Sequence, residues 1–352
     1  MPMPLNAAHK WTNTKGNVKH SSCLRILAVI PGSATDHGSM VFAKRQAAAL
    51  EALGGRVQTF FITSRTNPLS IIQEWLRLRR EIKAFKPDVI HCHYGTMTAF
   101  IAICATKRPI VITYRGSDLN PVPSGKYLRT LFSHILSQIS AIRARRIICV
   151  SQGLAGRLLW CQAKANVIPT GVDNKVFKPM PQTEARSRLG MGNDPVVLFN
   201  AGRFPKVKRI DLAEMAVAEV KKYLPNVKFI VLRGDTLPET IPLYHNAADV
   251  LLVTSDFEGS PTIVQEAVAC GLPVVSVDVG DVPERLRSVV PSKIVSRDSV
   301  LLGAALLEII SLKQRSNGPE IAAMEFANTM VVSQVFKVLQ SAVSATAGDY
   351  SG

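Results

Sequence analysis

The sequence predicts an α/β protein of two domains, each of them a parallel β-sheet covered by helices. The chain has 352 residues, which is more than one hydrophobic core usually organises. Short apolar runs alternate along it with helical patterns, as they do in parallel sheets. A turn- and proline-rich stretch, VIPTGVDNKVFKPMP, interrupts the alternation, which then starts again. We therefore expect two Rossmann-like domains that face each other across a cleft.

The first alternation opens with an apolar strand, LRILAVI (24–30), and the helical pattern VFAKRQAAALEALGG. Further β-rich runs follow: VQTFFI, DVIHCHYG, PIVITYRG and IICVS. The second alternation contains VVLFNAG, VKFIVLRG, ADVLLVTS and PVVSVDVG, with helices expected from about Asp211 and about Pro261. The predicted units are a flexible tail (1–23), an N-terminal domain (24–180), a C-terminal domain (181–315), and a C-terminal helix and tail (316–352) that packs back on the N-terminal domain.

The net charge of +16 is concentrated in the first half of the chain. Residues 1–175 hold 24 Lys and Arg against 7 Asp and Glu, whereas the second half holds 18 against 19. A basic domain beside a neutral one indicates contact with an anionic surface, and a generally basic proteome is the alternative. Aromatic residues make up only 6%, and no nucleic-acid-binding motif accompanies the charge, so we expect no nucleic-acid partner.

Targeting and redox signals favour a cytoplasmic location. No apolar run approaches the roughly 20 residues that span a bilayer. The first 22 residues lack the apolar centre of a secretion signal. The six cysteines form no Cys-x-x-Cys pair, which is typical of reduced thiols.

The segment NAGRFPKVKRIDL places Arg203 and Lys208 just after a buried strand. Ligands of such sheets bind at the carboxyl ends of the strands. An Arg fork and a Lys point charge suit a diphosphate and would stabilise the charge that develops on a leaving nucleotide diphosphate. The alternative is a surface loop with solvated charges.

The segment VTSDFEGSPTIVQEAVACGLPVVSVDVGDVPERL carries two carboxylates, Glu258 and Glu266, around a helix start. We expect Ser260 to cap a helix whose first residue is Pro261. The free N–H groups of a helix start also bind phosphate or sugar oxygens. Carboxylates on both sides of such a start suit a nucleotide sugar, which has hydroxyls at both ends and phosphates in the middle. A solvated Glu266 is the alternative.

These motifs resemble those of glycosyltransferase family four. Glu258 and Glu266 match the family's motif of two Glu separated by seven residues, and GRFPKVK matches its Gly-Arg loop with a Lys five residues later. VIPTGVDNKVF (167–177) is similar to the interdomain Pro-x-Gly-Val-Asp signature, and Gly280 and Glu284 follow the last strand as in the family. In the first half of the chain, DVIHCHYG and ITYRGSD are similar in type to the family's segments at these places, and the resemblance is weaker there. The wording of the second segment is closest to enzymes of bacterial surface-polysaccharide assembly, including those for teichuronic acid.

The resemblance implies a GT-B fold with the acceptor on the first domain and the donor mainly on the second. It implies that Arg203 and Lys208 bind the diphosphate, that Glu258 binds the donor sugar and that Glu266 binds the ribose, with Arg203, Lys208 and Glu258 as catalytic residues. The implied donor-binding set is Gly38, Arg203, Lys208, Glu258, Gly259, Ser260, Pro261, Thr262 and Glu266.

The sequence departs from the family pattern in three places. Only Gly38 stands where the family has paired glycines, and Arg115 stands where it commonly has a His before Gly-x-Asp. The chain between VLRG and IPLYHNAADV is shorter than the family norm, in the region that recognises the base. We place His91, His93, Arg115 and Asp118 on the side of the acceptor and the donor sugar. No third ligand lies near the His pair, so we expect no metal site and no cofactor beyond the nucleotide sugar.

The function predicted is that of a retaining, metal-independent glycosyltransferase of the hexosyltransferase type. Its partners would be a nucleotide sugar, a glycan or lipid-linked acceptor, and an anionic membrane surface on the cytoplasmic side. Ile71, Ile72, Trp75 and Leu76 share a segment with Arg77, Arg79 and Arg80, and we expect part of this segment to insert shallowly at that surface. The alternative is that the apolar residues pack on the sheet and the charges are solvated. The alternatives are a nucleotide-sugar epimerase of the same architecture, a basic nucleic-acid-binding protein, and a degenerate transferase fold that serves as a partner subunit.

Overall fold

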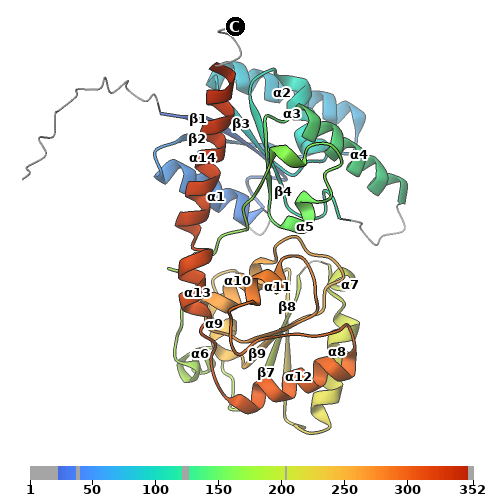
Figure 1. Cartoon of the computed structure of the whole chain (residues 1–352), viewed down its shortest axis with the longest axis vertical. Helices are drawn as coiled ribbons and strands as arrows, with labels where there is room; N and C mark the ends of the chain where they lie inside the picture. The colour runs from blue at the N-terminus through green and yellow to red at the C-terminus, as the bar shows by residue number, and fades with distance from the viewer. Residues whose placement is uncertain (1–22, 37–39, 121–126, 203, 348–352) are drawn as a thin grey trace, which may run out of the picture.

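The computed structural model describes residues 23–36, 40–120, 127–202 and 204–347. It confirms the predicted fold class, because two parallel sheets with helices on both faces lie one above the other (Figure 1). Gly38 and Arg203, both predicted site residues, lie outside the described residues. No helix in the described part of the chain is long and apolar enough to cross a membrane.

The N-terminal sheet has six strands in the order β2-β1-β3-β4-β5-β6. Their bounds are β1 Arg25–Pro31, β2 Arg56–Ile62, β3 Val89–His93, β4 Ile110–Tyr114, β5 Arg146–Cys149 and β6 Ala165–Val167. The three central strands, β1, β3 and β4, are almost entirely buried. Strands buried on both faces read as continuous apolar runs, and this is why LRILAVI and PIVITY are recognisable in the sequence.

Helices cover both faces of this sheet (Figure 1). One face carries α2 (Pro68–Phe85), α3 (Met97–Ala105), α4 (Tyr127–Arg143) and α5 (Gln152–Ala155). The other carries α1 (Val41–Ala52) and α14 (Asn328–Ala347). Val331, Val335 and Leu339 of α14 share a buried cluster with strand residues from the opposite end of the chain.

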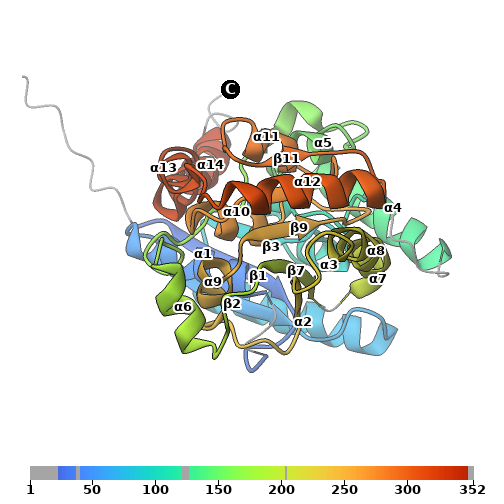
Figure 2. The same cartoon turned by 90° about the horizontal axis from the view of Figure 1, so that it is seen from below.

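The C-terminal sheet has five strands in the order β11-β10-β9-β7-β8. Their bounds are β7 Val196–Gly202, β8 Lys228–Arg233, β9 Val250–Val253, β10 Val274–Ser276 and β11 Lys293–Ile294. The helices around it are α6 Gln182–Arg188, α7 Pro205–Lys208, α8 Ile210–Lys221, α9 Ile241–Ala247, α10 Thr262–Ala269, α11 Val282–Leu286 and α12 Ser299–Leu312. Seen from below, α8 and α9 lie on opposite sides of β7 (Figure 2).

Two chain segments cross between the domains side by side. The first follows β6, and the second joins α13 (Gly318–Glu325) to α14. They are tied by a bridge between Val172 and Ala327. A Cβ at Gly171 would lie 2.9 Å from the Cα of Asn328, so only glycine permits this approach.

One local prediction is wrong. Helix α10 begins at Thr262, with Pro261 as its N-cap residue and no side-chain cap. Ser260 does not cap it, because its hydroxyl donates to Asp281 Oδ2 at 2.8 Å and accepts from Gln265 Nε2 at 2.6 Å. The first N–H groups of α10 therefore remain without a side-chain partner.

Candidate active site

The polar residues that follow the strands meet between the two domains. In both sheets the strand order reverses beside the first strand of the domain, β1 or β7, which is where open α/β sheets bind ligands. A pocket that we call the central pocket opens there, lined from the N-terminal domain by Tyr94 and Arg115 and from the C-terminal domain by Lys208, Glu258 and Thr262. A second, the flanking pocket, shares Arg115 and Thr262 with it and is also lined by Glu266.

Lys208 and Glu258 form an ion pair in the central pocket. The Lys208 ammonium lies 2.5 Å from Glu258 Oε1, and the two side chains are 21% and 12% exposed. Lys208 ends the short helix α7 after β7, while Glu258 lies in the loop between β9 and α10. A cation beside a carboxylate, both mostly withdrawn from water, can bind an anion and a set of hydroxyls at the same time.

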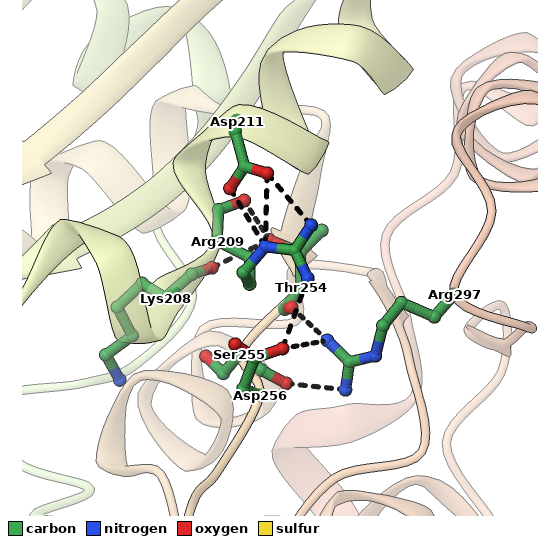
Figure 3. Close-up of polar contacts among 7 residues, drawn as sticks. All are labelled: Lys208, Arg209, Asp211, Thr254, Ser255, Asp256 and Arg297. Carbon is green, nitrogen blue, oxygen red and sulfur yellow. Dashed lines mark hydrogen bonds and ion pairs between the residues drawn. The ribbon is translucent and has the colours of Figure 1, made fainter. Parts of the chain in front are cut away.

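A network of hydrogen bonds and ion pairs lies next to the backbone of Lys208 (Figure 3). Thr254 donates to the backbone oxygens of Lys208 (2.8 Å) and Arg209 (3.0 Å). Arg209 pairs with Asp211 at 2.9 Å and with Asp256 at 3.3 Å. Arg297 donates to Thr254 O at 2.7 Å and to Asp256 at 3.2 Å.

The Lys208 side chain points away from this network (Figure 3). The network therefore fixes the backbone on which Lys208 stands and leaves its amino group to the pocket. Sequence reasoning missed Asp256 and Arg297, although VTSD directly follows a predicted strand.

The two domains touch through backbone at the edge of the pocket. A Cβ at Gly259 would lie 2.0 Å from the carbonyl oxygen of Arg115, a distance that no side chain tolerates. Asn120 also reaches across and donates to the backbone oxygen of Glu258 at 2.9 Å. Sequence reasoning missed Asn120, because nothing in its own segment indicates a partner 138 residues away.

Glu266 stands on α10 and faces the flanking pocket with 16% of its side chain exposed. One oxygen lies 3.7 Å from Nε2 of the buried His245. The uncapped start of α10 lies between Glu258 and Glu266, since Thr262 lines both pockets. The two carboxylates thus lie on either side of a helix start without a side-chain cap, and their binding of hydroxyls stays a prediction.

His91 and His93 lie inside the N-terminal sheet, with exposures of 0% and 1%. His91 Nε2 is 2.7 Å from Thr113 Oγ1. Burial, helped by the nearby Arg115 cation, lowers the pKa of His91 to about 3. Burial, then His91 and then Arg115, holds the pKa of His93 well below its ordinary value. Both rings are therefore neutral at physiological pH, and the described residues contain no cluster of three His, Cys, Asp or Glu side chains that could hold a metal ion.

Asp118 is fully buried and organises the loop after β4. Its carboxylate accepts backbone N–H bonds from Gly116 (2.8 Å), Arg115 (3.1 Å) and Gly95 (3.3 Å). Burial raises the pKa of Asp118, and these hydrogen bonds partly oppose the rise. The structure thus places Asp118 behind the pocket, where it shapes the backbone on which Arg115 stands.

The outer surface of α4 is apolar, whereas its inner face is made mostly of small residues. Leu136, Ser137, Ser140 and Ala141 are buried in the second half of the helix, and the buried Ala144 directly follows its last residue. The exposed face carries Leu128, Leu131, Phe132, Ile135, Ile139 and Ile142. Leu159 and Trp160, exposed by 65% and 71%, extend this face into an apolar groove. We call these eight residues the α4 face.

The segment on α2 that the sequence singles out is partly used inside the fold. Ile71 and Trp75 pack against the core of the N-terminal domain, and Trp75 Nε1 donates to Cys104 O at 3.1 Å. Arg77 pairs with Glu74 at 2.6 Å. Only Ile72 and Leu76 of the four apolar residues are well exposed, so at most part of this segment can contact a membrane, and that contact stays a prediction.

Two family models match the chain. The model "Glycosyltransferase Family 4" matches residues 33–176, and "Glycosyl transferases group 1" matches residues 195–311. A protein of Bacillus subtilis named as a teichuronic acid biosynthesis glycosyltransferase, TuaC, is 27% identical over 216 residues, which are 56% of this chain and 54% of that protein. D-inositol 3-phosphate glycosyltransferase of Segniliparus rotundus is 29% identical over 170 residues, or 39% of this chain and 38% of that protein. The chain thus spans about half or less of the length of these two relatives.

Solved structures share the fold over nearly the whole chain. Sucrose-phosphate synthase from Thermosynechococcus elongatus superposes with a TM-score of 0.74 at 19% identity, over 91% of this chain and 100% of that one. HepE of Anabaena in complex with UDP-glucose superposes with a TM-score of 0.70 at 19% identity, over 90% and 100%. These likenesses, with the two facing sheets, define a protein of the GT-B fold. With the two matching models, they place the chain in glycosyltransferase family four.

The close contact between the domains predicts the effect of one substitution. In Gly259→Ala the new methyl group would clash with the Arg115 carbonyl, so the two domains would move apart at this edge. The Lys208–Glu258 pair would then no longer share a pocket with Arg115 of the N-terminal domain. We expect turnover of a confirmed donor to fall at least tenfold while far-UV circular dichroism is unchanged. Gly192→Ala is the control, since its Cβ would meet nothing within 4 Å. Full activity of the Gly259 variant would contradict this account of the interface.

Proposed function

We propose that the protein is a retaining glycosyltransferase that moves a sugar from a nucleotide-diphosphate donor to an acceptor hydroxyl. The observation that carries the proposal is the Lys208–Glu258 pair at the carboxyl ends of the strands, in a pocket lined by both domains. Membership of family four supports it.

In the proposed reaction the acceptor hydroxyl attacks the anomeric carbon from the face that the diphosphate leaves. The bond from the anomeric carbon to the phosphate oxygen breaks as the bond to the acceptor oxygen forms, and a phosphate oxygen takes the proton. Lys208 stabilises the negative charge that develops on the diphosphate. Glu258 binds hydroxyls of the donor sugar, Glu266 binds the ribose, and the start of α10 receives a phosphate or sugar oxygen.

Removing the Lys208 charge should therefore slow turnover. For Lys208→Ala we expect a loss of about 100- to 1000-fold in kcat, as for the removal of one oxyanion donor, with the fold intact. Lys206→Ala is the matched control, because Lys206 stands on the same short helix and is exposed. The donor is first identified by thermal shift against UDP-, GDP-, ADP- and TDP-sugars, since a ligand at 100 times its Kd stabilises by about 2.7 kcal/mol. Near-normal turnover by Lys208→Ala would remove the central assignment.

Transfer should not depend on a divalent metal. In this proposal protein cations take the place of the magnesium or manganese ion that bridges donor phosphates in other enzymes. We expect the rate to be unchanged after dialysis against EDTA and unaffected by added manganese. An activity that chelation abolishes and manganese restores would refute the proposal and direct attention to Asp256 and Asp118.

We also propose that the acceptor is a lipid-linked or growing surface polysaccharide, at the inner face of the cytoplasmic membrane. The support is the α4 face and its charge. Residues 119–172 contain seven Lys and Arg and no Asp or Glu, so an apolar surface lies in a purely basic stretch. Such a surface suits the headgroup region of an anionic bilayer, whereas a second copy of the same basic face would be repelled.

Vesicle sedimentation tests this surface. The protein should pellet with anionic vesicles at low salt, and high salt should weaken the binding. Phe132→Ser with Ile135→Ser should reduce it at least tenfold, because each exposed apolar side chain contributes about 1.5–3 kcal/mol when buried. The same change at Val300 and Leu301, which are exposed to a similar degree (57% and 50%) on α12 of the C-terminal domain, is the control. Equal binding by both double variants, or a concentration-dependent dimer that the α4 change abolishes, would refute the membrane proposal alone.

A further inference from the structure

Arg115 is a cation without a carboxylate partner at the centre of the cleft. It follows β4 and lines both the central and the flanking pocket. No ion pair among the described residues includes it. Its guanidinium meets only neutral groups: Gln46 Oε1 at 3.3 Å and His93 Nδ1 at 3.4 Å.

The rest of the guanidinium is also poorly satisfied. Its Nε is buried and has no hydrogen-bond partner in the described part of the chain. The Phe42 ring covers the group at 4.0 Å from the ring centroid. Asp118 does not supply the missing partner, because its two oxygens accept backbone N–H bonds.

This arrangement is costly unless a ligand completes it. Burial lowers the pKa of Arg115 to about 10, against the opposing influence of Tyr94 and Asp118, so the group remains charged at physiological pH. A cation that is partly withdrawn from water is stabilised by an anion, and a guanidinium fork binds a carboxylate through two parallel hydrogen bonds. The neighbouring cation, Lys208, already has Glu258.

We infer that Arg115 binds a carboxylate of the donor sugar, so that the donor is a nucleotide-linked uronic acid. This inference rests on the proposed function. Arg115 shares the central pocket with Glu258, the residue assigned to the sugar hydroxyls, and it approaches from the opposite domain. The diphosphate is assigned to Lys208 on the C-terminal domain. A neutral hexose would leave the guanidinium without an anion, whereas a sugar carboxylate supplies one.

Paired donors that differ only in this carboxylate provide the test. Dissociation constants are measured by calorimetry for UDP-glucose and UDP-glucuronate, UDP-galactose and UDP-galacturonate, and GDP-mannose and GDP-mannuronate. No acceptor is needed. In at least one pair the uronate should bind about 10- to 100-fold more tightly, the usual range for a charge-assisted hydrogen-bonded contact.

Variants assign the preference to Arg115. Arg115→Gln should abolish the preference within the pair and leave the neutral donor's Kd nearly unchanged, and Arg115→Lys should restore part of it. Arg45→Gln is the matched control, because Arg45 is an exposed cation that lines the flanking pocket. It removes the same charge and should keep the preference.

Two results would overturn the inference. One is equal binding of both members of every pair by the unsubstituted protein. The other is a loss in Arg115→Gln that is equal for uronate, neutral sugar and free UDP, which would assign the guanidinium to the diphosphate. In both cases nucleotide sugars still bind and the proposed function stands. Binding of no nucleotide sugar in the panel would instead refute the proposed function, and the inference with it.

Discussion

The approach of Gly259 to the carbonyl of Arg115 is the constraint on which the cleft depends. Each sheet presents its strand ends to the other, but loops with side chains would hold the two edges apart. Gly259 has no side chain to keep the two loops apart. The hydrogen bond from Asn120 to the Glu258 backbone fixes the position of one loop relative to the other. Glu258 is thereby presented to the N-terminal domain, with Arg115 opposite. The crossing segments, bridged between Val172 and Ala327, connect the two domains at a second place.

Charge in the cleft is arranged in layers. Asp256, Arg209 and Arg297 compensate one another behind the pocket, where they need no ligand. Lys208 and Glu258 neutralise one another within the pocket. A ligand that has both phosphates and hydroxyls can bind Lys208 through a phosphate and Glu258 through a hydroxyl. Arg115 forms no ion pair with a carboxylate among the described residues, although the buried Asp118 nearby favours its charged form, and this is the basis of the inferred preference for one class of donor. Burial is the main reason that His91 and His93 are neutral, and the Arg115 cation adds to it, because a second positive charge beside it would be unfavourable.

Much of the fold could be predicted because its strands are buried on both faces. LRILAVI and VVLFNAG are apolar apart from Arg25 and Asn200, and β1 and β7 fall on them almost residue by residue. Loops were harder to predict. Ser260 precedes a helix as a capping residue would, but its hydroxyl is held by Asp281, 21 residues away, and local pattern carries no sign of that. For the same reason Asn120 and Arg297 were missed, and the assigned roles of Lys208, Glu258 and Glu266 stay predictions. The exposed apolar face of α4 could have been predicted from the sequence. Ser137 and Ser140 alternate with its large apolar residues, and these small polar residues indicate the side of the helix that faces the sheet.

The α4 face and the cleft are neighbours, and this connects the two parts of the proposed function. Arg157 lines the apolar groove of α4 and also a third pocket, distinct from the central and flanking pockets, which Asn120 and Glu258 line as well. His134 of α4 contacts the backbone oxygen of Asn120 at 2.9 Å, and Asn120 in turn holds the Glu258 loop. An acceptor whose lipid lies along α4 would therefore bring its polar end to the open side of Glu258, without crossing the flanking pocket that Glu266 lines. Donor and acceptor would then enter the cleft from different sides. Front-face transfer requires this, because the acceptor hydroxyl and the departing diphosphate share one face of the sugar. The rest of the donor and the rest of the acceptor must therefore avoid each other.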